Sequence, residues 1–178
     1  EKNYHFFFDR FLHYFFTDND AALLQSMGMN LLRLPVNYRH FEDDNAPFEV
    51  KEDGFMHLDR VIDICARHEI YTIIDLHAAP GYQNEDWHSD NPVHRSFFWK
   101  HKQFRDRTLH LWKEIARRYR GNPWVMGYDL LNEPSDPTGA MLEPLLWEIS
   151  EAIDTVDPDH LRIFEGNWFG NECSAFTR

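Results

Sequence analysis

Apolar side chains recur along this chain in two alternating patterns, one with helical spacing and one forming a short continuous run. Helical spacing, with apolar residues three and four positions apart, occurs in four segments, which span residues 17–27, 58–66, 104–119 and 142–153. Each segment leads into an apolar run, and these runs begin at residues 30, 71, 125 and 162. Such runs are typical of strands buried on both faces. The alternation predicts an α/β fold in which helices cover a parallel sheet.

The first predicted helix carries its own start and stop signals. Thr17 and Asp20 resemble a capping box, and Gly28 follows the last apolar residue. Before this helix, residues 5–16 place phenylalanines at helical spacing, which indicates a further amphipathic helix packed on a neighbouring element. A platform for stacking sugar rings is the alternative, because aromatic side chains present flat apolar faces.

Two long polar segments follow the first two predicted strands. They span residues 37–54 and 78–95 and are rich in His, Asp, Asn and aromatic residues. In a parallel sheet the loops after the strands gather at one edge, and in a (β/α)8 barrel they build the active face. We therefore expect the functional residues at the carboxyl ends of the strands.

Charged side chains within or just after the apolar runs are the first candidates for chemistry. Burying a charge is costly, so each needs a partner, a ligand or a water-filled cleft. The residues concerned are Arg33, Asp75, Glu133 and Glu165. Because the strands bring them to a common edge, they predict a catalytic rim. A purely structural network, in which Arg33 neutralises Asp75 or Glu165, is the alternative.

Glu133 is the strongest single candidate. It follows the apolar run that begins at Val125, with Asn132 before it and Pro134 after it. A carboxyl group beside an amide donor is suited to acid-assisted cleavage of a glycosidic bond. A carboxylate that caps the next helix is the alternative, since Pro134 fits a first helical turn. For His77, at another strand end, an imidazole bonded to the backbone is the alternative to an active-site role.

Residues 81–91 form a polar loop that fits a saccharide better than a metal ion. Its hydrogen-bonding side chains, Asn84 among them, suit a polar cleft, and Trp87 offers a flat face to a sugar ring. The alternation of Asp86, His88 and Asp90 suggests metal ligands but lacks a standard ligand spacing. The sequence therefore predicts no metal. It also contains no Gly-rich phosphate loop or nucleophile elbow, so no cofactor is predicted.

Composition narrows the class of partner. Of the 178 residues, 43% are hydrophobic and 27% charged, as in a globular domain, and the formal net charge is −12. This charge argues against nucleic acid and anionic membranes as partners, whereas neutral sugars are compatible. No segment approaches the roughly 18 apolar residues of a membrane span, and no signal-peptide pattern occurs. Cys65 and Cys173 show no C-x-x-C spacing, so the cysteines do not indicate a reducing or an oxidising compartment.

Four motifs in order resemble glycoside hydrolase family 5, the cellulase family of retaining β-glycosidases. They are Leu32-Arg33-Leu34-Pro35, the run from Asp75 to Gly81 with His77, Asn132-Glu133-Pro134, and Glu165-Gly166-Asn167. The resemblance extends from about residue 17 onward. It implies a (β/α)8 barrel in which Glu133 is the general acid/base and Asn132 bonds the 2-hydroxyl of the cleaved sugar. Arg33 and His77 match positions that support sugar binding and the nucleophile.

The resemblance also implies a substrate and an incomplete barrel. The sequence from Leu76 to Asn84 is similar to the corresponding loop of the exo-β-1,3-glucanase and β-glucosidase branch, although residues 87–90 depart from it. This similarity points to β-linked glucan as the substrate. Family members carry the nucleophilic glutamate on the seventh strand, and this chain resembles strands two to five. We therefore expect residues 1–178 to be a single partial catalytic domain that is inactive alone. Open sheet edges predict self-association or pairing with a C-terminal portion. A non-catalytic carbohydrate-binding half barrel that uses Trp87 and Trp168 is the alternative.

Overall fold

The computed structural model describes residues 2–174 and residue 176, and its centre is a four-stranded parallel sheet. The strands follow the chain in the order β1, β4, β5 and β6, with β1 and β6 at the two edges of the described sheet. Their bounds are Leu31–Asn37, Tyr71–Ala78, Val125–Asp129 and Leu161–Ile163. All four lie where apolar runs predict them, and the predicted parallel pairing is confirmed.

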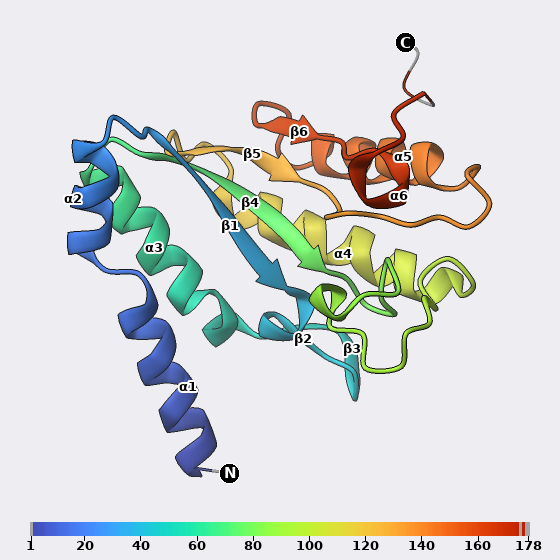
Figure 1. Cartoon of the computed structure of the whole chain (residues 1–178), viewed down its shortest axis with the longest axis horizontal. Helices are drawn as coiled ribbons and strands as arrows, with labels where there is room; N and C mark the ends of the chain where they lie inside the picture. The colour runs from blue at the N-terminus through green and yellow to red at the C-terminus, as the bar shows by residue number, and fades with distance from the viewer. Residues whose placement is uncertain (1, 175, 177–178) are drawn as a thin grey trace.

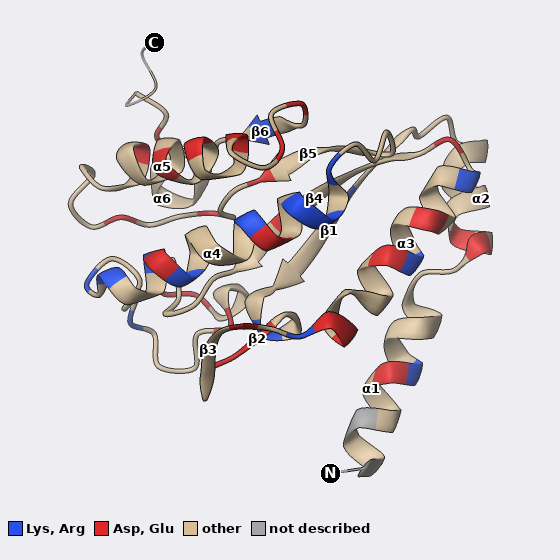
Figure 2. Ribbon diagram, turned by 180° about the vertical axis from the view of Figure 1, so that it is seen from behind, with Lys and Arg blue, Asp and Glu red and all other residues tan. Residues whose placement is uncertain are grey.

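Helices connect these strands and cover the sheet. The connecting helices are α3 (Met56–Arg67), α4 (Lys102–Tyr119) and α5 (Leu142–Asp154), and α1 (Lys2–Phe15) and α2 (Asp18–Ser26) precede β1. Figure 1 shows α4 behind β1 and β4, and Figure 2, from the opposite side, shows it in front of them. The capping box at Thr17 is present, with the Asp20 carboxylate accepting from the Thr17 backbone N–H at 2.8 Å. No helix among the described residues is long and apolar enough to cross a bilayer.

Strand alternation separates the hydrophobic core from the functional face. Leu34, Ile74 and Tyr128 lie side by side in register and join the core between the sheet and its helices. Successive strand residues point to opposite faces, so the neighbouring positions Asp75 and Asp129, and Arg33 before Leu34, share the other face. The same strand register thus buries the apolar side chains on one face of the sheet and brings the charged side chains together on the other.

The carboxyl ends of β5 and β6 differ from the expected strands. The apolar run from Val125 continues to Leu131, but the strand ends at Asp129, because β6 pairs with it only as far as Ile163. Leu130 and Leu131 are buried within the turn that follows. Glu165 likewise lies beyond the end of its strand. The Glu133 and Glu165 carboxylates therefore lie on segments that follow the strands.

The first polar segment contains structure that the sequence does not predict. Residues 37–54 include a short antiparallel hairpin of β2 (Glu42–Asp43) and β3 (Ala46–Val50), between the 3-10 turns η1 (Tyr38–His40) and η2 (Glu52–Phe55). The second segment contains η3 (Trp87–Ser89), and α6 (Asn167–Gly170) follows β6. The hairpin lies on α4, where Arg107 pairs with the buried Glu42. This buried ion pair helps to hold the hairpin against the helix.

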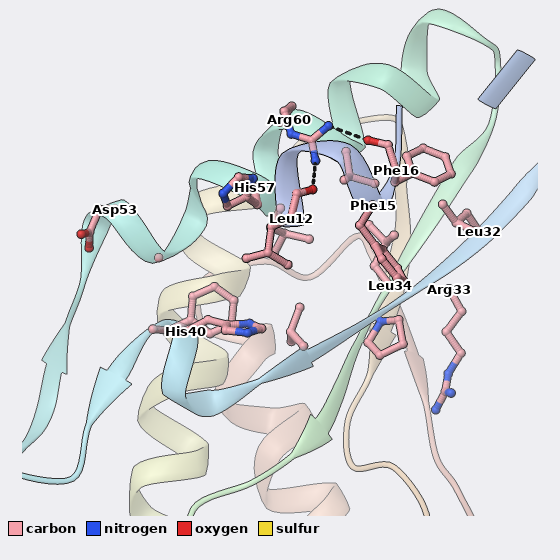
Figure 3. Close-up of a pocket in the computed structure, with 16 residues that line it drawn as sticks. Leu12, Phe15, Phe16, Leu32, Arg33, Leu34, His40, Asp53, His57 and Arg60 are labelled. Atoms are coloured by element: carbon pink, nitrogen blue, oxygen red, sulfur yellow. Dashed lines mark hydrogen bonds between the residues drawn. The ribbon is translucent and has the colours of Figure 1, made fainter. Parts of the chain in front are cut away.

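An apolar cavity of about 400 Å³ lies where α1 and α3 approach β1 (Figure 3). Leu12, Phe15 and Phe16 line it together with Leu32 and Leu34 of β1. In α3 the Arg60 guanidinium donates to the backbone oxygens of Leu12 and Phe16, at 2.8 and 2.7 Å. The helix predicted from the phenylalanine spacing is present, but the expected packing of its phenylalanines holds for Phe16 and not for Phe8 and Phe11, which are 42% and 48% exposed. Several of its aromatic side chains are exposed, namely Tyr4, Phe6, Phe7, Phe8, Phe11, Tyr14 and Phe15.

Candidate active site

Arg33 stands at the centre of a charged cluster at the carboxyl end of the sheet. Its Nη2 lies 3.2 Å from the Asp75 carboxylate, 2.9 Å from that of Asp129 and 2.8 Å from that of Glu165. Nη2 also donates to Asn132 Oδ1 at 2.8 Å, and Nε donates to Asp129 at 2.9 Å. The ion pairs expected of Arg33 with Asp75 and Glu165 are thus present, and they lie at the same rim as the candidate acid.

One guanidinium faces three carboxyl groups in this cluster. Burial raises the pKa of Asp75, and it raises the pKa of Asp129 with a further contribution from the negative charge of Asp75. Burial also raises the pKa of Glu165, although the Glu133 backbone N–H opposes the change. Among the described atoms, Oδ1 of Asp75 and Oδ1 of Asp129 are buried without a hydrogen bond. The site is therefore polar and short of positive charge.

The shortage of positive charge predicts a stabilising substitution. Asp129→Asn should raise the free energy of unfolding at about pH 8, because the amide keeps an acceptor for Arg33 but carries no charge to be desolvated or repelled by Asp75. The folded-state pKa of Asp129 lies above the ordinary 3.8, so its contribution to stability is present below pH 3.8 and is lost as pH rises through the folded-state value. The gain should fade by about pH 3.5. Urea unfolding at both pH values, with the exposed Asp63→Asn as control, measures it; an equal effect at both would contradict the assignment.

His77 is held by a carboxylate and not by the backbone. Its Nδ1 lies 2.8 Å from Asp75 Oδ2, which fixes the ring orientation at the end of β4. The buried Gln83 joins this strand end to the turn after β5. It accepts from the Ala79 N–H and donates to the carbonyl oxygens of His77 and Asn132, at 3.0, 2.8 and 3.0 Å. Gln83 thus locks the two strand ends together.

Glu133 has a fixed backbone and an open side chain. Its φ of 44° is in the left-handed region, which is unfavourable for a residue other than glycine. Two contacts hold it there, because its N–H donates to Glu165 Oε2 at 2.7 Å and its carbonyl accepts from Asn84 Nδ2 at 2.9 Å. The side chain is 43% exposed, and Oε2 lies 2.9 Å from His88 Nε2. The carboxyl group therefore reaches the rim from a rigid position.

The helix-cap alternative for Glu133 is wrong. The next helix, α5, begins at Leu142, and the Asp136 carboxylate accepts from the N–H groups of Met141 and Leu142, at 2.6 and 3.1 Å. Asp136 performs the capping. Glu133 is left at the rim.

Asn132 offers a donor directly beside Glu133. The residue is only 2% exposed, and Arg33 occupies its Oδ1. Its Nδ2 is buried and has no hydrogen-bond partner among the described residues. An amide N–H without a partner is costly in a protein interior.

The loop with the alternating Asp86, His88 and Asp90 does not bring these side chains together. His88 turns towards Glu133, whereas Asp90 pairs with Arg39 at 2.7 Å. Within the described residues, no group of three or more His, Cys, Asp or Glu side chains is arranged to hold a metal ion.

The predicted tryptophans occupy two elements near Glu133. Trp87 is 81% exposed on η3, next to His88. Trp168 is 49% exposed on α6, with φ of 51°, and its neighbour Phe169 has its ring 6.2 Å from that of His88. Both indoles are open to solvent. Asn84, by contrast, is fully buried. Its amide nitrogen donates to the Glu133 carbonyl, and its amide oxygen accepts from the Asp86 N–H.

Sequence reasoning missed three residues of this site. Asp129 met the criterion that identified Arg33 and Asp75, a charge in an apolar strand, and could have been found by it. Gln83 gave no signal, because a loop glutamine has many possible roles. The sequence pattern around His88 suggests only a metal ligand. Its contact with Glu133 cannot be predicted, because it depends on how two distant loops fold.

Comparison with known proteins identifies the family of this chain. The family model named Cellulase (glycosyl hydrolase family 5) matches residues 7–177. A β-xylosidase of Phanerodontia chrysosporium is 55% identical over 171 residues, which cover 96% of this chain and 36% of the relative. A glucan 1,3-β-glucosidase of Candida oleophila is 33% identical, over 68% of this chain and 29% of the relative.

A solved structure of a glycoside hydrolase superposes with a TM-score of 0.76 at 29% identity, and the match covers 88% of this chain and 48% of that one. The chain thus spans less than half the length of these three proteins. Its parallel strands, with a helix between each pair, correspond to part of a (β/α)8 barrel. The chain belongs to glycosyl hydrolase family 5.

Proposed function

We propose that this chain forms the acid/base half of a retaining β-glycosidase active site, with Glu133 as the general acid/base. The observation that carries the proposal is the Glu133 carboxyl group, open at the rim while its backbone is held from both sides. A proton donor must reach the glycosidic oxygen from a fixed position, and a rigid backbone with a free carboxyl group meets that requirement. No metal or cofactor is part of the proposal.

The surrounding residues take supporting roles in the proposal. Asn132 is assigned the bond to the sugar 2-hydroxyl, a bond that strengthens in the transition state. Arg33 and His77 order the carboxylates of the site and contact the sugar. Trp87 and Trp168 bind sugar rings on their exposed faces. Asn84 contributes by holding the Glu133 carbonyl, and its direct contact with saccharide stays a prediction.

The nucleophile of this mechanism lies, in our proposal, on strands beyond those of the chain. A retaining enzyme needs a second carboxyl group about 5–5.5 Å from the first, ionised and free to attack the anomeric carbon. Glu165 is near, but it accepts from Arg33 and from the Glu133 N–H, and burial raises its pKa. These contacts support a positioning role. We therefore infer that residues 1–178 form a single partial catalytic domain.

The proposed substrate is a β-linked glucan or a related oligosaccharide. The likeness to a glucan 1,3-β-glucosidase supports a glucan, whereas the higher identity to a β-xylosidase favours a β-xyloside as the second candidate. Aryl β-glucosides and aryl β-xylosides, assayed in parallel, distinguish the two.

Glu133→Gln tests the proposed acid in the complete enzyme that carries this chain. We expect kcat/KM on unactivated β-glycosides to fall by roughly 10²- to 10⁴-fold, the usual contribution of general acid catalysis. The exposed Glu148→Gln, on α5, is the matched control and should retain full activity. Full activity with glutamine at position 133 would overturn the proposal. Saccharide binding without hydrolysis by the parent enzyme would favour a carbohydrate-binding protein instead.

A further inference from the structure

His88 makes a contact with the proposed acid that neither the family motifs nor the fold requires. Its Nε2 lies 2.9 Å from Glu133 Oε2 and 3.0 Å from Asn84 Nδ2. The orientation of the Asn84 amide is fixed, because its oxygen accepts from the Asp86 N–H and its nitrogen donates to the Glu133 carbonyl.

At 2.9 Å the contact of Glu133 Oε2 with His88 Nε2 is a hydrogen bond, with one proton between the two atoms. A ring nitrogen has either one N–H or one lone pair, so Nε2 forms one full hydrogen bond, and the Asn84 amide lies close beside it. The bond to Nε2 fixes the direction of Oε2, the atom from which an acid catalyst transfers its proton.

The position of the His88 ring is fixed by its surroundings. Of the two residues that follow it, Asp90 pairs with Arg39, and the Ser89 hydroxyl donates to the Asp86 carbonyl at 2.8 Å. The ring itself lies near the rings of Phe169, Trp87 and His77, with centroids 6.2, 6.1 and 5.9 Å away. An imidazole held in this way can fix the direction of the carboxyl group it contacts.

We propose that His88 is a positioning residue for the proton transfer, one that directs Glu133 Oε2 and its proton towards the glycosidic oxygen. The proposal rests on the proposed role of Glu133. In the first step the proton moves from Oε2 to the leaving oxygen as the bond from that oxygen to the anomeric carbon breaks and the nucleophilic carboxylate bonds to the carbon. In the second step water attacks the anomeric carbon and gives a proton to Glu133, the bond to the nucleophile breaks, and the contact with Nε2 forms again.

His88→Phe tests the proposal, because phenylalanine keeps an aromatic ring but lacks the ring nitrogen. In the complete enzyme, kcat/KM is measured on phenyl and 2,4-dinitrophenyl β-glycosides. The dinitrophenolate group leaves without acid assistance, whereas phenolate needs the proton. We expect a loss of about 10²-fold on the phenyl glycoside, the scale of a misplaced catalytic group, and less than about threefold on the dinitrophenyl glycoside. His101→Phe, an exposed histidine among aromatic rings, is the matched control and should change neither value.

Equal losses on both substrates, or no loss on either, would overturn the role of His88. Circular dichroism melting of each variant identifies an equal loss caused by unfolding, and His88→Gln, which keeps an acceptor, should then restore part of the selective loss if the proposal holds. Glu133→Gln, assayed on the same pair, separates this inference from the proposed function. Selective loss in Glu133→Gln but not in His88→Phe contradicts only the role of His88. Absence of selective loss in Glu133→Gln contradicts the proposed acid itself.

Discussion

The 178-residue chain by itself is expected to hydrolyse aryl β-glycosides on the order of 10⁴ to 10⁶ times more slowly than the same chain within a complete barrel, because groups that act as one catalytic unit lose most of their effect when one is removed. The chain supplies Glu133, and the carboxylate beside it, Glu165, is occupied by Arg33 and the Glu133 N–H. A fluorogenic β-glucoside and β-xyloside, assayed at equal protein concentration, give the ratio.

Glu133→Gln is the internal control for this comparison. It should lower the activity of the complete barrel but leave the residual rate of the isolated chain unchanged, since that rate does not use the paired mechanism. Substantial turnover by the isolated chain that disappears on Glu165→Gln would contradict the expectation. That result would make Glu165 the nucleophile.

Trp112→Ala is expected to destabilise the fold by about 3–5 kcal/mol, as is usual when a buried tryptophan is truncated. The side chain is fully buried on α4, with its ring 5.5 Å from that of Tyr128. Its Nε1–H donates to the Leu130 carbonyl at 2.9 Å, at the start of the turn that leads to Asn132. The substitution therefore leaves a cavity and a buried carbonyl without its donor. Urea unfolding followed by circular dichroism measures the change.

Two further variants separate the causes of this loss. Trp112→Phe keeps most of the volume but removes the donor, so it should cost about 1–2 kcal/mol. Trp87→Ala removes an indole that is 81% exposed and should change stability by less than about 0.5 kcal/mol. An unfolding midpoint of Trp112→Ala equal to that of the parent chain would contradict the role assigned to this tryptophan.

The main elements of the fold could be predicted because local patterns and tertiary burial agree. Four helices with apolar stripes that alternate with four apolar runs predict a parallel sheet covered by helices, and the structure contains this sheet. The hairpin of β2 and β3 could not be predicted in the same way. Its strands are short and mostly exposed, so no alternation marks them, and its position depends on Arg107 of α4, 65 residues beyond Glu42.

The candidate site could be predicted as far as strand position determines it. Arg33 and Asp75 stand out because a charge in an apolar strand requires a partner, and the register then brings them together. Loop residues follow no such rule. His88 reaches Glu133 only because its loop folds back over the strand ends, held by the Asp90 pair with Arg39. Contacts of this kind are set by tertiary structure alone.

The left-handed backbone of Glu133 ties the placement of the catalyst to two particular contacts. A residue with a side chain loses on the order of 1 kcal/mol in that conformation, and here the Glu165 carboxylate and the Asn84 amide offset the loss. If either contact failed, residue 133 could relax to an ordinary backbone geometry and swing its carboxyl group away while the sheet stayed intact. Damage at these two positions would therefore lower activity far more than it lowers stability.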